Sequence, residues 1–340
     1  MLTFSRDFFK EETREGFTID ATMKTFWAAE MEVLREISEV CERHGIQWYA
    51  AYGTLLGAVR HKGYVPWDDD MDIWMFREDY EKFLKIAPLE LPHGYIVQSP
   101  LTEVGYTQFH SCIFNALSIS IEKERLERFH GCPFATGVDI FPLDYLPDKE
   151  EEREGEKTVF NLICNVVGLI KKEEKTEEDR NDLDEALNVL EDFSGMHFSR
   201  ELLETKEEKK FLSEVYKLGN RLCASYHEED GSNAVVYMGY HMNPTKVYKK
   251  EWFSDVIMQP FENVFIPVPV GYDEILKVTY GDYRVRVQNG SCHDYPLYNK
   301  QLNYLRGIVD DMEEKTNRLE ELIEKAREKN VRIADDVEIR

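Results

Sequence analysis

Apolar residues recur every three or four positions between residues 21 and 44, and Gly45 follows directly. This spacing predicts an amphipathic helix that ends at the glycine, a residue that readily adopts the left-handed backbone of a helix end. The next segment, IQWYAAY at residues 46–52, is apolar and aromatic and predicts a strand. A short helix is then expected, ending near His61. The first part of the chain therefore reads as helix, strand and helix.

Further elements follow from the same kind of periodicity. Amphipathic spacing predicts helices at residues 77–87 and 272–280. Apolar runs predict strands at residues 95–98, 109–121, 138–141 and 264–270. The strand at residues 264–270 is expected at the edge of a sheet because it contains prolines. The predicted fold class is α/β, with a small mixed sheet, flanking helices and a helical subdomain.

Charge clusters set the middle of the chain apart. Residues 148–235 contain runs such as KKEEKTEEDRNDLDE, which are typical of solvated helix faces, and we interpret them as a charged helical insertion. We divide the chain into a catalytic core (residues 1–147), this insertion (residues 148–235), a later part of the core (residues 236–298) and a C-terminal helix (residues 299–340). The C-terminal helix has an apolar stripe that either packs on the body, the simpler interpretation, or pairs two subunits in a homodimer. The stripe comprises Leu302, Leu305, Val309, Met312, Leu319, Leu322 and Ala326.

Composition limits the classes of partner and location. The 340 residues are 42% hydrophobic, enough for one large or two moderate domains. No apolar run approaches the ~18 residues that span a bilayer, and the N-terminus lacks the order of a signal peptide, so we expect a cytoplasmic protein. A net charge of −24 argues against binding to nucleic acid or anionic membranes. The scattered cysteines form no CxxC pair, which indicates reduced thiols rather than a zinc site.

Candidate chemistry lies in residues 68–72, which carry four aspartates. Asp70 and Asp72 are separated by Met71 and followed by apolar residues, a pattern that predicts a strand with both carboxylates on one face. Two adjacent carboxylates repel each other unless a cation joins them, and oxygen ligands of this kind suit Mg²⁺ or Mn²⁺. The alternative is a solvated turn, the usual setting of aspartates that follow a proline.

The segment that precedes the aspartates is suited to phosphate. Gly53 and Thr54 lie where the predicted strand meets the short helix, and a glycine at a helix N-terminus lets an anion approach the backbone. Arg60, His61 and Lys62 follow, and their positive charge can reach phosphate oxygens. The alternatives are an ordinary tight turn and a basic helix end that complements the helix dipole.

The stretch GTLLGAVRHKGYVPWDDDMDI, residues 53–73, resembles the signature of the LicD-type phosphotransferase family. That family is related to fukutin-like ribitol-phosphate transferases and has a nucleotidyltransferase-like fold. Two later stretches agree in order, namely GVDIFPLD at Gly137–Asp144 and VPVGYDEILKVTYGDY at Val268–Tyr283. The first stretch is long and specific, whereas the other two alone are weak signals.

The resemblance implies an enzyme that moves a phospho-alcohol group, such as phosphocholine or ribitol phosphate, from a cytidine diphosphate (CDP)-linked donor to a hydroxyl of a cell-surface glycan or glycolipid precursor. It implies that Asp70, Asp72 and Asp139 bind Mg²⁺ or Mn²⁺ and carry catalysis. The residues that it places at the substrate are Gly53, Thr54, Arg60, His61, Lys62 and His293. Phosphoryl-type transfer fits such a set, because it needs neutralised phosphates and an aligned hydroxyl more than covalent chemistry from the protein.

Two alternatives to this function stay open. The same fold is compatible with transfer of a nucleotidyl group to a small molecule or protein, in which case the nucleoside monophosphate is retained on the acceptor. In a different class, the chain is a non-catalytic acidic binding module whose carboxylates do not converge. Metal-dependent binding of a cytidine nucleotide separates the enzymes from the binding module.

Overall fold

The structure is a computed structural model that describes residues 1–101, 105–205, 207–230, 233–236, 246–288 and 295–328. The chain divides into two compact units, Met1–Ser291 and Cys292–Arg340. This division differs from the four parts drawn from the sequence, whose internal boundaries stay predictions. Each unit is described separately below.

The first unit is built on a seven-stranded mixed sheet. Its main path has the order β3-β4-β7-β6-β5, and β8 and β9 continue it beside the far end of β7. β4 and β7 are parallel, and the other pairs are antiparallel. The strands are β3 (Tyr49–Ala50), β4 (Asp72–Phe76), β5 (Ile96–Gln98), β6 (Ser111–Phe114), β7 (Gly137–Tyr145), β8 (Ala234–Val236) and β9 (Tyr248–Lys249).

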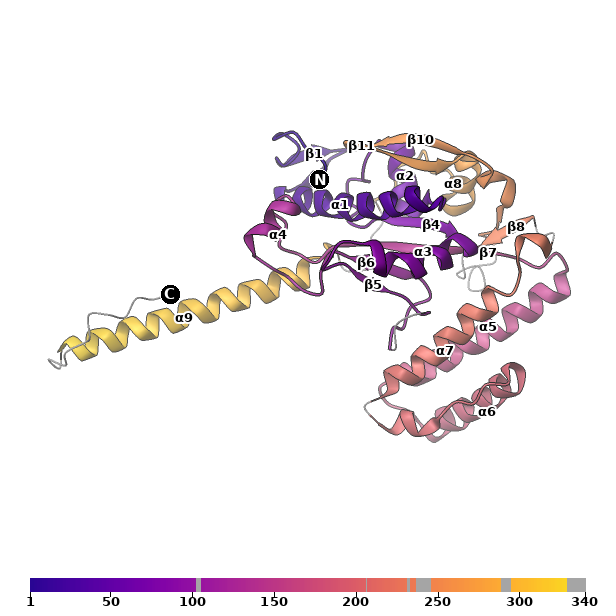
Figure 1. Cartoon of the computed structure of the whole chain (residues 1–340). Coiled ribbons are helices and arrows are strands. Elements are labelled where there is room, and N and C mark those ends of the chain that lie inside the picture. The colour runs from indigo at the N-terminus through magenta and orange to yellow at the C-terminus, as the bar shows by residue number, and fades with distance from the viewer. Residues whose placement is uncertain (102–104, 206, 231–232, 237–245, 289–294, 329–340) are drawn as a thin grey trace. The chain divides into compact units, whose positions relative to one another are not determined.

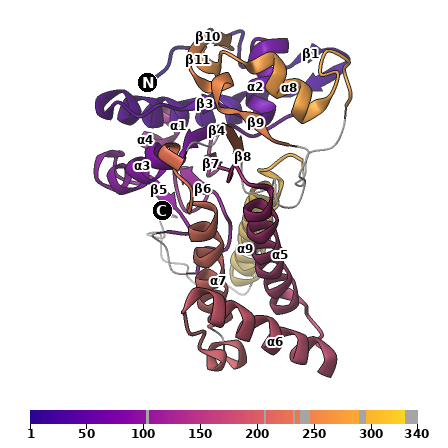
Figure 2. The same ribbon diagram turned by 90° about the vertical axis from the view of Figure 1, so that its right-hand side faces the viewer.

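Helices cover both faces of this sheet, which confirms the predicted α/β class. α1 (Ala21–His44) and α3 (Arg77–Glu90) pack against β7. α2 (Tyr52–Arg60) packs against β4, and α8 (Tyr272–Tyr280) lies next to α2. The hairpin of β10 (Val256–Phe261) and β11 (Val264–Pro269) lies on the same side as α2 and α8 (Figures 1 and 2).

The amphipathic helices match their predictions because their ends are coded locally. The Asp20 side chain accepts a hydrogen bond from the Met23 amide at the start of α1. Gly45 ends the helix with φ 60°, a left-handed conformation that favours glycine. The apolar stripe of α1 is buried, as its spacing predicted. The remaining elements of this unit are β1 (Glu12–Arg14), β2 (Phe17–Ile19), α4 (Lys123–Arg128) and the short 3₁₀ turns Arg200–Glu204, Glu228–Asp230 and Lys250–Phe253.

The charged segment is helical, as predicted, and has an apolar core of its own. α5 (Glu150–Lys171), α6 (Glu177–Ser194) and α7 (Glu208–Cys223) pack together (Figure 2). Phe160, Leu187 and Phe211, one from each helix, are buried between them. The charged residues occupy the outer faces of these helices, which is why charge runs dominate the sequence here.

Three strand predictions differ from the structure. The strand expected at residues 46–52 is reduced to Tyr49–Ala50, because α2 already begins at Tyr52. The strand expected at 109–121 is only Ser111–Phe114, which is the part that pairs with β7. The placement of Asp70 on a strand was wrong, because β4 begins at Asp72. Tertiary pairing decides these boundaries, and the sequence carries little signal for it.

The second unit contains α9 (Asn299–Glu328), where the C-terminal apolar stripe predicted a helix. Among the described residues of both units, no helix is long and apolar enough to cross a membrane.

Candidate active site

Two of the predicted aspartates lie next to each other on adjacent parallel strands. Asp72 of β4 and Asp139 of β7 are register partners. Partners in neighbouring strands, which run about 4.8 Å apart, point to the same face of the sheet. Trp74 lies on that face too and packs on Tyr52 of α2, with ring centroids 4.9 Å apart. Both carboxylates therefore lie on the face of the sheet that α2 covers.

Backbone and hydroxyl hydrogen bonds hold Asp72 in this position. The Asp72 amide donates to Thr54 Oγ1 at 2.8 Å, and the Ala51 amide donates to the Asp72 carbonyl at 3.0 Å. On the other side, the Asp139 amide donates to the Met71 carbonyl at 2.9 Å. Thr54 is buried, so its hydroxyl is fixed at the start of β4. The first turn of α2 thus sets the position of the aspartate directly.

Asp68 and Asp70 form a second acidic pair just before β4. Their side chains lie within hydrogen-bonding reach of each other. Burial, followed by the Asp70 charge, raises the pKa of Asp68 well above its usual range. The sequence pattern drew attention to Asp70 and left Asp68 without a role.

Helix α1 contacts residues 68–71, which precede β4 and form the acidic loop. Trp27 Nε1 donates to the Asp68 carbonyl at 3.1 Å, and the Trp27 ring stacks on Tyr64 with centroids 4.4 Å apart. Tyr64 donates its hydroxyl hydrogen bond to Glu30, which is only 1% exposed. Burial, followed by the Asp69 and Asp70 charges, raises the pKa of Glu30. A signal for Glu30 was present in the sequence, since it is a carboxylate on the buried stripe of a helix.

Gly53 is required where α2 approaches the acidic loop. A Cβ atom added to Gly53 would overlap Asp68 Oδ2 and lie within contact distance of the rest of that carboxyl group. The glycine therefore allows the helix and the loop to approach each other closely, which is the role that a strand-to-helix glycine has when a phosphate approaches the backbone.

We expect Gly53→Ala to lower both stability and activity. The new methyl must displace the Asp68 side chain, and overpacking of this kind costs about 1–3 kcal/mol of unfolding free energy. Gly155→Ala in α5 is the matched control: its Cβ meets nothing within 4 Å, so we expect about 0.5–1 kcal/mol of stabilisation. Urea unfolding of both variants measures the difference, and equal effects of the two substitutions would contradict the close approach.

A cavity of about 260 Å³ opens beside Gly53 and Asp68. Arg60 lines it, and Arg60 Nη1 donates to the Tyr283 carbonyl at 2.8 Å. Tyr280, which sequence reasoning did not select, lines it as well. Burial, followed by the Asp72 and Asp68 charges, raises the pKa of the Tyr280 phenol. Tyr280, which is 43% exposed, thus shares the lining of this cavity with Asp68.

The other predicted substrate residues are not all at this cavity. His61 Nε2 lies 3.3 Å from Glu15 Oε2, and burial lowers the pKa of His61. Lys62 is exposed and has a left-handed backbone with φ 57°. His293 lies outside the described residues. Contact of these three residues with a substrate stays a prediction.

His110 is a further neighbour of the aspartates that the sequence did not single out. Its Nε2 lies 3.4 Å from Asp139 Oδ2, and its ring packs on Phe141 with centroids 4.6 Å apart. His110 immediately precedes β6, so only the pairing of β6 with β7 brings it to Asp139. An imidazole in contact with a carboxylate is a common arrangement for proton transfer.

Oxygen ligands for a divalent cation are present at this site. Asp68 and Asp70 lie within reach of each other, and Asp72 and Asp139 lie side by side, so the donor set consists of carboxylates, which Mg²⁺ prefers. Within the part of the chain that the structure describes, no group of three or more His, Cys, Asp or Glu side chains stands ready to hold a metal ion. The donor chemistry fits the ion, and its binding stays a prediction.

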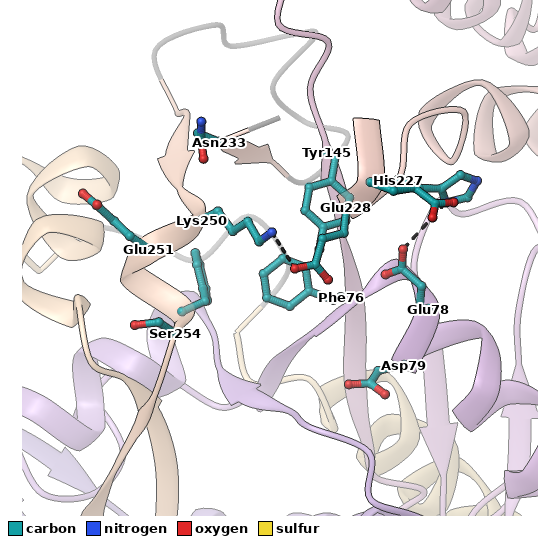
Figure 3. A pocket seen from close by; sticks show the side chains of 12 residues that line it. Phe76, Glu78, Asp79, Tyr145, His227, Glu228, Asn233, Lys250, Glu251 and Ser254 are labelled. Atoms are coloured by element: carbon teal, nitrogen blue, oxygen red, sulfur yellow. Dashed lines mark hydrogen bonds and ion pairs between the residues drawn. The ribbon is translucent and has the colours of Figure 1, made fainter. Parts of the chain in front are cut away.

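A larger cavity of about 1080 Å³ lies at the opposite ends of β4 and β7, against Phe76 and Tyr145 (Figure 3). Lys250 and Glu228 pair across it at 2.6 Å, and His227 lies 3.6 Å from Glu78. None of the residues predicted for catalysis or substrate binding lines this cavity. The end of the sheet with Asp72 and Asp139 is therefore the better candidate for the reaction site.

Comparison with known proteins agrees with this location. Residues 45–121 match the family described as "LicD/FKTN/FKRP, nucleotidyltransferase domain". This range includes α2, the acidic loop, β4 and His110, whereas Asp139 follows it.

Individual relatives carry informative names. The chain is 26% identical over 266 residues to "Lipopolysaccharide cholinephosphotransferase LicD" of Haemophilus influenzae, which covers 74% of this chain and 88% of that protein. It is 40% identical over 48 residues to "Ribitol 5-phosphate transferase FKRP" of Homo sapiens, covering 14% of this chain and 10% of that protein. An uncharacterized protein of Rickettsia typhi is 35% identical over 85 residues, covering 23% and 28%. Taken with the family match, these similarities support the LicD-type family of transferases for this chain.

Proposed function

We propose that this protein is a metal-dependent transferase that moves a phospho-alcohol group from a CDP-linked donor to a hydroxyl of a cell-surface glycan precursor. The observation that carries the proposal is the pairing of Asp72 with Asp139 on the face covered by α2, next to a cavity bordered by Gly53 and Arg60. The relatives are named as transferases of phosphocholine and of ribitol phosphate, and one acts on lipopolysaccharide. We propose the same class of reaction here, in the cytoplasm.

Each group has a definite task in this proposal. Asp70, Asp72 and Asp139 would hold Mg²⁺ or Mn²⁺, which when bound neutralises the donor phosphates. Gly53 lines the cavity at the first turn of α2, where backbone amides and the helix dipole favour the anionic diphosphate.

Activation of the acceptor is the second requirement. A sugar hydroxyl is a weak nucleophile until a base takes its proton. Asp139 is half-buried, with 36% of its side chain exposed, and it contacts His110 at 3.4 Å. We propose that Asp139 orients the acceptor hydroxyl and accepts its proton, and that His110 holds the Asp139 carboxylate in place.

Arg60 is expected to act on the donor. Arg60→Lys keeps the charge but loses the bidentate geometry of the guanidinium, so we expect a tenfold to hundredfold loss of kcat/KM for the donor, or about 1.4–2.7 kcal/mol. Steady-state kinetics with varied donor measures the change, and Arg43→Lys on the exposed end of α1 is the control. Unchanged donor kinetics in Arg60→Ala would assign the residue to holding the Tyr283 carbonyl.

A donor screen tests the function itself. The full chain is incubated with CDP-choline, CDP-ribitol and related conjugates, Mg²⁺ and a candidate glycan, and the products are identified by mass. We expect release of cytidine monophosphate and an acceptor heavier by the phospho-alcohol. Retention of the nucleotidyl group on the acceptor would favour the nucleotidyltransferase alternative. Absence of any Mn²⁺-dependent thermal shift with cytidine nucleotides would favour the non-catalytic binding module.

A further inference from the structure

Helix α9 exposes large apolar side chains along one face. Val309 and Met312 are 50% and 61% exposed, and Ile308 is 38% exposed. Asn299–Glu328 is 30 residues long, which corresponds to about 45 Å of helix. Most of the stability of a helix in a protein comes from packing of its apolar face. A helix of this length with an exposed apolar stripe needs a partner surface of similar length.

The stripe has the period of a coiled coil. When Thr316 is included and Ile323 is counted in place of Leu322, the intervals along this face alternate between three and four residues, which is the 3.5-residue repeat of heptad positions a and d. The a positions are Leu302, Val309, Thr316 and Ile323, and the d positions are Leu305, Met312, Leu319 and Ala326. A partner that follows such a seam must itself be a helix with the same repeat.

We propose that α9 pairs with α9 of a second copy of this chain as a parallel, in-register, two-stranded coiled coil. The residue types at the seam support this geometry. Val309, Thr316 and Ile323 are β-branched at successive a positions, and Leu305 and Leu319 are leucines at d positions. β-branched residues at a with leucine at d favour parallel dimers over higher oligomers.

Charges flanking the seam select the parallel orientation. In a parallel pair, the g residue of one helix faces the e residue of the next heptad on the other, which places Lys315 opposite Glu320 of the second copy. The antiparallel alignment with the greatest overlap would instead place Glu313 beside Glu313 and Lys315 beside Lys315 of the second copy. It would pair opposite charges only at Arg306 and Glu320. The parallel pair thus gains opposite charges on both sides, whereas the antiparallel one brings like charges together.

Thr316 is the one polar residue at these a positions, and it is compatible with the seam. Its hydroxyl donates to the Met312 carbonyl of its own helix at 2.9 Å, so its burial leaves no unpaired donor. In register, Thr316 faces Thr316 of the second copy. A shift by one heptad would place it against Val309 or Ile323 and shorten the overlap, so the threonine favours the in-register pair.

The oligomeric state of the full chain tests the proposal. Each chain has a mass of 40.0 kDa, so light scattering after size-exclusion chromatography is expected to give about twice that mass at micromolar concentration. Val309→Asp introduces like charges at the seam and is expected to give a monomer. Asp310→Asn, on the neighbouring outer position, is expected to remain a dimer. A monomeric wild-type chain, or a Val309→Asp variant that stays dimeric, would overturn the assignment.

Cysteine cross-linking tests orientation and register. In the parallel pair, Val309→Cys places two thiols next to each other, and mild oxidation is expected to link the copies covalently. Asp310→Cys, one residue away on the outside of the pair, is the matched control, and the wild-type chain reports any linking through native cysteines. Absence of cross-linking in Val309→Cys while the chain is dimeric, or linking only between Val309→Cys and Leu319→Cys copies, would exclude the parallel arrangement.

Discussion

Asp72→Asn and Asp139→Asn are each expected to lower the rate of transfer by on the order of a thousandfold, in proteins that remain folded. The two side chains are register partners on one face of the sheet, so each substitution removes one of two negative charges that lie side by side. Removing a charge from a repelling pair does not destabilise the apo protein. Loss of activity without loss of stability is the expected signature of residues that bind charge rather than fill a core.

The two variants are expected to differ in the step that they impair. Asp72→Asn, and likewise Asp70→Asn, should weaken both donor binding and transfer, because these carboxylates would hold the ion that neutralises the phosphates. Asp139→Asn should retain donor binding, measured by calorimetry with a non-reacting CDP conjugate, and lose transfer. Asp148→Asn, on an exposed position, is the matched control. Near-wild-type activity of Asp72→Asn at saturating Mg²⁺ would show that the metal assignment is wrong.

Arg77→Met is expected to lower the unfolding free energy by about 3–5 kcal/mol, the usual cost of removing one partner of a buried ion pair. Arg77 is 2% exposed and bridges three elements. Its Nε and Nη2 donate to the two carboxylate oxygens of Asp144 at 2.6 and 2.8 Å. Its Nη1 donates to Asn220 Oδ1 at 2.6 Å, which connects the sheet to α7 of the helical segment. Removal of the guanidinium leaves the Asp144 charge buried without its partner.

Urea unfolding of the full chain measures this effect, and two further variants make it specific. Arg77→Met combined with Asp144→Leu removes both charges and is expected to be less destabilised than Arg77→Met alone. Arg43→Met breaks the exposed pair of Arg43 with Glu90, which is expected to cost at most about 1 kcal/mol. If Arg77→Met cost no more than Arg43→Met, the buried pair would contribute little to the fold.

Sequence periodicity predicted the elements whose boundaries depend on nearby residues. α1 follows its apolar spacing between Asp20 and Gly45, and α8 ends at Gly281 as expected. These boundaries are local because a cap or a left-handed glycine acts within one turn of the helix. The long motif of residues 53–73 likewise located α2 and the acidic loop, since all of its members are close together in the chain.

Strand ends, by contrast, depend on partners that are distant in the chain. Asp70 reads as part of an alternating strand, yet pairing with β7 begins only at Asp72. The contact of His110 with Asp139 likewise requires β6 to pair beside β7, and no spacing in the sequence encodes that neighbour. Glu30 lies on a helix face that periodicity assigns to the core, and its partner Tyr64 is set by how α1 packs on the loop.

The residue types therefore indicated the kind of chemistry at the candidate site, whereas the fold determined the geometry of that site. Carboxylates next to a glycine turn and an arginine indicate phosphate chemistry wherever they lie in a chain. Their convergence is a different matter, because Asp72 and Asp139 meet only through the parallel pairing of β4 with β7. Parallel strands require a crossover connection, so the residues that they bring side by side are always far apart in sequence. Local propensity acts over a few residues, and it cannot specify which distant strand supplies the second carboxylate.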